Sequence, residues 1–235
     1  MFALYKREMR SYFATTAGYA FLAVFFAVSG LLFGLFTLVI NRSTDVSMYF
    51  QALMFAYIVI IPLLTMRSFA EERRTRTEQL LLTAPISIGE MVAAKFFAAF
   101  TLFFGSVVVT ALYFIPLSLY GEINMGRAIG CMVAVVFVGA CFIAIGIFIS
   151  SLTDNQFTAA LVTVGILAAL MFIQFLNALI DVMWVRNVIS FISIASRYNG
   201  FTQGVFDYAA ALYYVSICGL FLFFACRVFE RRRWA

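Results

Sequence analysis

The sequence predicts an all-α integral membrane protein with six transmembrane helices, and both its composition and its patterning support this class. Of the 235 residues, 65% are hydrophobic and only 11% are charged, whereas a soluble domain is about half apolar and about a quarter charged. So few charged side chains cannot cover a water-facing surface. The apolar residues form long continuous runs, unlike the short alternating segments of a membrane β-barrel, so helices are the expected spanning elements.

Six apolar runs approach or exceed the roughly 20 residues that a helix needs to cross a bilayer. They cover residues 18–40, 49–66, 96–119, 128–152, 157–180 and 209–229. The first run follows the basic segment YKREMR, but it is too long for the apolar region of a signal peptide, and no small-residue cleavage site follows it. We therefore predict one transmembrane domain over residues 1–235, with the first span retained.

Residues 1–16 are predicted to form an interfacial helix ahead of the first span. Apolar and aromatic side chains recur there at steps of three and four residues, which places them on one helical stripe about 100° wide. The stripe consists of Phe2, Tyr5, Met9, Tyr12 and Phe13. Lys6, Arg7 and Arg10 occupy another face. We favour a helix lying in the membrane interface with its apolar stripe facing the bilayer; the alternative is a polar start to the first span.

The connection between the last two spans, residues 181–208, is too apolar for a free loop and too interrupted to cross the membrane. It is predicted to form a re-entrant or interfacial hairpin that turns near Tyr198–Gly200. Six spans place both termini on one side, where twelve Lys and Arg residues lie against four on the other. This bias predicts a multi-pass protein of the cell (inner or cytoplasmic) membrane with both termini in the cytoplasm.

Charge is concentrated in one place, between the second and third spans. The segment MRSFAEERRTRTEQLLLTAPISIGE runs from Met66 to Glu90, and six of the eight residues from 71 to 78 are charged. Helical spacing pairs Glu72 with Arg76. Pro85 ends the helix, and SIGE at 87–90 is a capping box for the third span. We predict a short cytoplasmic helix within segment 67–90, with some of its leucines contacting protein.

The residues that catalysis or metal binding would need are missing. The chain has no histidine, its four cysteines form no CxxC motif, and the middle of every predicted span lacks charged residues. We therefore predict no catalytic residue, no metal site and no cofactor in this chain, with the cysteines serving as small packing residues. The net charge of +5 does not indicate nucleic acid, because the basic residues flank apolar runs, where topology and anionic lipids explain them.

The segment MRSFAEERRTRTEQLLLTAPIS resembles the signature of ABC-2-type transporter permeases, in particular the branch that includes gliding-motility permeases and the permease of nitrous-oxide-reductase maturation. Weaker agreement extends along the chain, including the FERRRW ending. The sequence departs at Arg76, where that family usually has glycine, a change at the turn before the helix.

This resemblance implies a non-catalytic permease subunit of an ATP-driven transporter, with export as the expected direction. Its partners would be two ATP-binding cassette ATPase subunits carrying ATP and Mg²⁺, a second permease copy or paralogue, and membrane lipids. Segment 67–90 would contain the coupling helix that docks on the ATPase. The implied contacts are Glu71, Glu72, Arg73, Thr77, Glu78, Gln79, Leu80, Leu81 and Leu82.

Two other functions stay open from the residues alone. A membrane scaffold or lipid-handling protein would bind anionic lipid through the same segment, and a neighbouring gene for a cassette ATPase would argue against it. A secondary transporter is less favoured because the spans lack internal charge. The sequence does not identify the substrate; a transport path, if present, would be lined by Met54, Phe55, Ile58, Gln174 and Asn177.

Overall fold

The structure is a computed structural model that describes residues 1–41, 44–75, 87–119, 121–176, 183–184, 193–202 and 207–233, without the side chains of 40, 41, 174–176, 199, 202 and 233. The described elements are helical. They are α1 (Phe2–Ala14), α2 (Thr16–Phe33) with a π-helical continuation (Gly34–Asn41), α3 (Ser47–Thr65), α4 (Ala70–Arg74), α6 (Ile88–Thr110) with a 3-10 turn (Ala111–Tyr113), α7 (Phe114–Leu117), α8 (Met125–Leu152), α9 (Gln156–Leu176), α11 (Ile194–Thr202) and α12 (Tyr208–Arg233).

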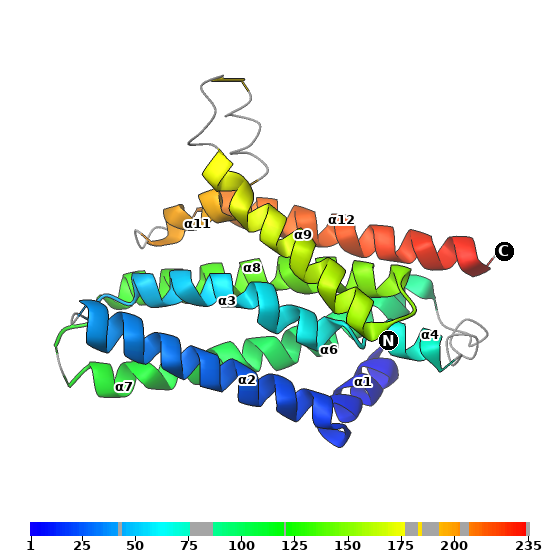
Figure 1. Cartoon of the computed structure of the whole chain (residues 1–235), viewed down its shortest axis with the longest axis horizontal. Coiled ribbons are helices and arrows are strands. Elements are labelled where there is room, and N and C mark those ends of the chain that lie inside the picture. The colour runs from blue at the N-terminus through cyan, green and yellow to red at the C-terminus, as the bar shows by residue number, and fades with distance from the viewer. Residues whose placement is uncertain are drawn as a thin grey trace.

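The predicted fold class is confirmed. Within the described ranges, six helices are long and apolar enough to cross a membrane, namely α2, α3, α6, α8, α9 and α12 with their extensions. Figure 1 shows both chain ends, α1 and α4 at one end of the bundle, which we call the terminal end. Helices α7 and α11 lie at the opposite end, which we call the far end (Figure 1).

Helix α8 is the centre of the bundle and the most buried of the six spans. It packs against α3, α6, α9, α11 and α12. Close approach is possible because two of its residues lack side chains: a Cβ atom at Gly139 would collide with the ring of Phe103, and one at Gly146 with the side chain of Thr65. Its cysteines, Cys131 and Cys141, are buried and free, as expected for packing residues.

The helix of the third span begins ahead of the predicted apolar run. Helix α6 begins at Ile88 instead of residue 96, and the Ser87 hydroxyl accepts a hydrogen bond from the Glu90 N–H at 3.3 Å. The capping box at 87–90 therefore starts the membrane helix directly. As a result Lys95, which was expected to precede the span, lies two turns inside a helix and only 3% of its side chain is exposed.

The turn predicted at 198–200 is wrong, because these residues belong to helix α11. Ile194, Ala195, Tyr198 and Phe201 are all buried, and their spacing puts them on one helical face. Packing of this face against α8 and α9 outweighs the local turn signal of the Tyr-Asn-Gly sequence. The rest of the predicted hairpin lies mostly outside the described residues.

Helix α1 forms as predicted, but its apolar stripe is divided. Tyr5 and Tyr12 pack against the core, and the Tyr5 hydroxyl donates to Thr101 Oγ1 of α6 at 3.1 Å. Phe2 and Phe13 stay exposed. Thus α1 rests on protein along one edge of the stripe and leaves the other edge free.

Candidate functional site

The charged segment 67–90 is described at both of its ends, residues 67–75 and 87–90. Helix α3 ends at Thr65, a turn leads into α4, and α6 begins at Ile88. Of the predicted contact residues, Thr77, Glu78, Gln79, Leu80, Leu81 and Leu82 lie outside the described residues. The two roots of the segment, which join it to the membrane helices, form the candidate site.

The start of α4 is held by a side chain of α8. The Ser150 hydroxyl accepts hydrogen bonds from the backbone N–H groups of Phe69 and Ala70, both at 3.1 Å, and can donate to the Met66 carbonyl oxygen at 3.3 Å. Free N–H groups at a helix start need such an acceptor, which usually comes from the preceding residue. Here the acceptor is buried and comes from the central helix, so the position of α4 is tied to α8.

A buried lysine connects α4 with α6 and α1. Lys95 Nζ donates to Glu72 Oε1 at 2.8 Å and to the Ser68 carbonyl oxygen at 2.7 Å. It also lies 3.4 Å from Glu8 Oε2 and 4.9 Å from the centre of the Phe69 ring. We call Lys95, Glu72, Glu8 and the adjacent Arg7 the Lys95 cluster.

The two acids of the Lys95 cluster are turned inward. Only 18% of the Glu72 side chain and 14% of the Glu8 side chain are exposed. Arg7 is more exposed, and its Nη2 lies 2.7 Å from Glu8 Oε1 and 3.4 Å from Glu72 Oε1. Burying charges is unfavourable unless they are paired, and loss of one partner then costs about 3–5 kcal/mol. These contacts therefore hold α1, α4 and α6 together at the terminal end.

A second ion pair connects α4 with the turn between α8 and α9. The Arg73 guanidinium pairs with the Asp154 carboxylate, and its Nη1 donates to the Leu152 carbonyl oxygen at 3.2 Å. The end of α12 also contacts the start of α4, because the Phe69 and Phe229 rings lie 4.5 Å apart, centre to centre. A displacement of α4 would therefore act on several membrane helices.

The three predicted ATPase contacts that the structure describes point in different directions. Glu71 is exposed, Glu72 points into the Lys95 cluster, and Arg73 points toward Asp154. The predicted partner of Glu72, Arg76, lies outside the described residues. Sequence reasoning missed Lys95 as a site residue, although the capping box at 87–90 was a usable signal that the third helix begins before it.

Three of the five predicted path residues lie on α3. Met54 and Ile58 of α3 are buried, and the half-buried Phe55 ring lies 6.3 Å from that of Phe172 on α9. The Gln174 side chain and Asn177 lie outside the described residues. The described residues contain no group of three His, Cys, Asp or Glu side chains that could hold a metal ion.

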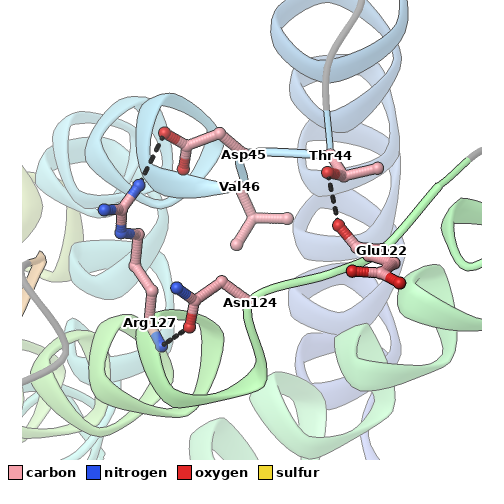
Figure 2. A pocket seen from close by; sticks show the side chains of 6 residues that line it. All are labelled: Thr44, Asp45, Val46, Glu122, Asn124 and Arg127. Atoms are coloured by element: carbon pink, nitrogen blue, oxygen red, sulfur yellow. Dashed lines mark hydrogen bonds and ion pairs between the residues drawn. The ribbon is translucent and has the colours of Figure 1, made fainter.

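A small polar pocket of about 130 Å³ lies at the far end, between the loop before α3 and the loop before α8 (Figure 2). Arg127 Nη1 lies 3.2 Å from Asp45 Oδ2, and the Thr44 hydroxyl donates to the Glu122 carbonyl oxygen at 2.7 Å. Burial would raise the pKa of Asp45, but hydrogen bonds from Ser47 and the Arg127 charge lower it overall. These contacts join the two loops.

The chain matches a known protein family. The sequence profile of a family described as "ABC-2 family transporter protein" matches residues 37–234. The match therefore contains both roots of segment 67–90, the central helix α8 and the last span. A search of curated proteins found no match to the chain.

Proposed function

Because the chain belongs to the ABC-2 family of transporter proteins, and is thus a multi-pass permease component of an ATP-binding cassette transporter, we propose that a separate ATPase subunit drives it through segment 67–90. The observation that carries this proposal is the anchoring of α4. Ser150, the Lys95 cluster and the Arg73–Asp154 pair fasten this short helix to α8, α6, α1 and the α8–α9 turn.

The anchoring suits a segment that receives force. A flexible loop would move without carrying the membrane helices with it, whereas a helix with buried ionic and hydrogen-bonded contacts moves them together. Glu71 is exposed on α4 and remains available to a partner. We place the ATPase against this exposed side of α4 and the following residues 76–86, with Glu72 and Arg73 holding the segment in position.

The remaining features of the proposal rest on the sequence pattern and the family. We propose export, with two permeases forming the path and two ATPases carrying ATP and Mg²⁺. The closer relationship to the gliding-motility and nitrous-oxide-reductase-maturation branch is proposed from residues 66–87 alone. The excess of Lys and Arg on the side of the termini supports a cytoplasmic location for the terminal end, in the cell membrane.

Charge reversal in segment 67–90 tests the proposal. The tagged chain is expressed together with the cassette ATPase subunit proposed as its partner, and the recovered ATPase is quantified after purification. We expect the Glu71→Arg/Glu78→Arg variant to recover at least about tenfold less ATPase, because opposed like charges cost several kcal/mol. The control is Glu230→Arg, which reverses a 45% exposed acid at the same end of the bundle.

The control variant should recover as much ATPase as the unmodified chain. All variants should insert into the membrane in similar amounts, which is measured by quantifying the tagged chain itself. Unchanged ATPase recovery by the double variant would contradict the proposal, as would an equal loss in Glu230→Arg.

A further inference from the structure

Helix α1 turns its one acidic side chain away from its outer surface. Glu8 is the only Asp or Glu between residues 1 and 14, and it points into the Lys95 cluster with 14% of its side chain exposed. Leu4 is buried on the same inner side, and Tyr5 and Tyr12 pack there as well. The outer side is left with basic and apolar residues.

That outer side combines two exposed phenylalanines with two exposed cations. Phe2 is 76% exposed and Phe13 46% exposed, and Lys6 and Arg10 are exposed beside them. At about 100° per residue, these four side chains fall within an arc of about 80°. Among the described residues, neither Lys6 nor Arg10 has a carboxylate partner. We call these four side chains the outer face of α1.

The position of α1 along the chain sets its depth in the membrane. Helix α1 ends at Ala14, and the first membrane-spanning helix begins at Thr16. The start of α2 packs closely against the end of α1, because a Cβ atom at Gly18 would collide with the Tyr12 backbone. Tyr19, 59% exposed, continues the aromatic edge with its ring 6.3 Å from that of Phe13. The outer face therefore lies where the apolar span starts, which is the level of the lipid headgroups.

We propose that the outer face of α1 binds anionic phospholipid headgroups. Phe2 and Phe13 enter the upper acyl region, and the long Lys6 and Arg10 side chains reach the phosphate groups beside them. A membrane surface supplies the anions that this face lacks among the described residues. The proposal requires only that the chain spans the membrane, so it stands independently of ATPase coupling.

The basic end of α12 provides a contrast at the same end of the bundle. Arg227 Nη1 lies 2.7 Å from Glu230 Oε2, so one of its cations is already neutralised within the protein. Arg231 is exposed. Removing Arg227 and Arg231 therefore takes away as many formal charges as removing Lys6 and Arg10, but fewer uncompensated ones.

The test measures lipid binding to the purified full chain in a neutral detergent. Short-chain phosphatidylglycerol is titrated and binding is followed by native mass spectrometry, with phosphatidylcholine of the same chain length as the neutral comparison. At low salt, we expect the unmodified chain to prefer phosphatidylglycerol and Lys6→Gln/Arg10→Gln to bind it about 30-fold more weakly, which corresponds to about 1 kcal/mol for each basic residue. Lys6→Arg/Arg10→Lys, which keeps both charges, should bind like the unmodified chain.

Two comparisons test whether binding is specific to the outer face of α1 and whether it requires a lipid instead of a free phosphate. Arg227→Gln/Arg231→Gln should weaken phosphatidylglycerol binding by less than about fivefold, and millimolar glycerol phosphate should not displace the lipid. Unchanged affinity in Lys6→Gln/Arg10→Gln, an equal loss in Arg227→Gln/Arg231→Gln, or displacement by glycerol phosphate would each overturn the proposal. Folding is checked by the thermal midpoint without lipid, which exposed substitutions should change little.

Discussion

Replacing Lys95 with methionine removes the buried cation that α1, α4 and α6 share. The ammonium group contacts Glu72 Oε1 at 2.8 Å, Glu8 Oε2 at 3.4 Å and the Ser68 carbonyl oxygen at 2.7 Å. Methionine is similar in length and fills the space, so the change is mainly electrostatic. It leaves two largely buried carboxylates near each other without their shared buried partner.

The size of the effect follows from these contacts. Breaking a buried ion pair by removing one partner costs about 3–5 kcal/mol. Arg7 stays beside both acids, but it is 53% exposed, and exposed pairs contribute at most about 1 kcal/mol. We therefore expect Lys95→Met to lower the free energy of unfolding by about 3 kcal/mol. For a chain of this length, that corresponds to a fall in Tm of about 6–12 °C.

Two buried cysteines of the chain can report its thermal unfolding. Cys131 and Cys141 are buried and free, so a thiol-reactive dye detects unfolding of the purified protein as these groups become accessible. The matched control is Lys6→Met, an exposed lysine on α1, which should shift Tm by about 1–2 °C at most. The double variant Lys95→Met/Glu72→Gln should be more stable than Lys95→Met alone, because it removes one of the two carboxylates that have lost their buried cation.

Two results would refute this reasoning. A fall in Tm of less than about 2 °C for Lys95→Met would show that the buried contacts contribute little. Simple addition of the Lys95→Met and Glu72→Gln effects in the double variant would show that the two side chains do not interact.

Two further predictions concern the packing of α8. Ser150→Ala should lower the free energy of unfolding by about 1–3 kcal/mol, because two buried N–H groups at the start of α4 lose their acceptor; an unchanged Tm would contradict this role. Gly146→Ala should lower the free energy of unfolding by about 1–3 kcal/mol, because the new Cβ atom would collide with Thr65. Gly165→Ala, where a Cβ atom meets open space, should be neutral or stabilising. The same Tm for these two variants would show that the close contact is unimportant.

The spans were predictable because the hydropathy of a segment depends on its own residues and not on the elements that it packs against. Long apolar runs must form helices in a bilayer, whatever they pack against. The same is true of the Ser87 cap, which acts within three residues of itself. Helix α6 begins at this cap, several residues ahead of the apolar run that was predicted to span the membrane.

The directions of side chains were harder to predict. The apolar stripe on α1 predicted an amphipathic helix, but Tyr5 and Tyr12 pack on protein while Phe2 and Phe13 stay exposed. Turn-forming residues at 198–200 are helical because Tyr198 is buried in the core. In both places, contacts with elements distant in the chain decided the outcome.

The sequence by itself determined that this chain has six segments apolar enough to cross a membrane as helices and that its charge gathers between the second and third of them, because transfer of apolar helices into lipid depends only on local composition. Tertiary structure decided which charges face inward. Lys95, Glu72 and Glu8 are separated by tens of residues, and only the packing of three helices brings them within hydrogen-bonding distance. Electrostatic pairing in a dry interior depends on distances of a few ångströms, which spacing along the chain does not specify.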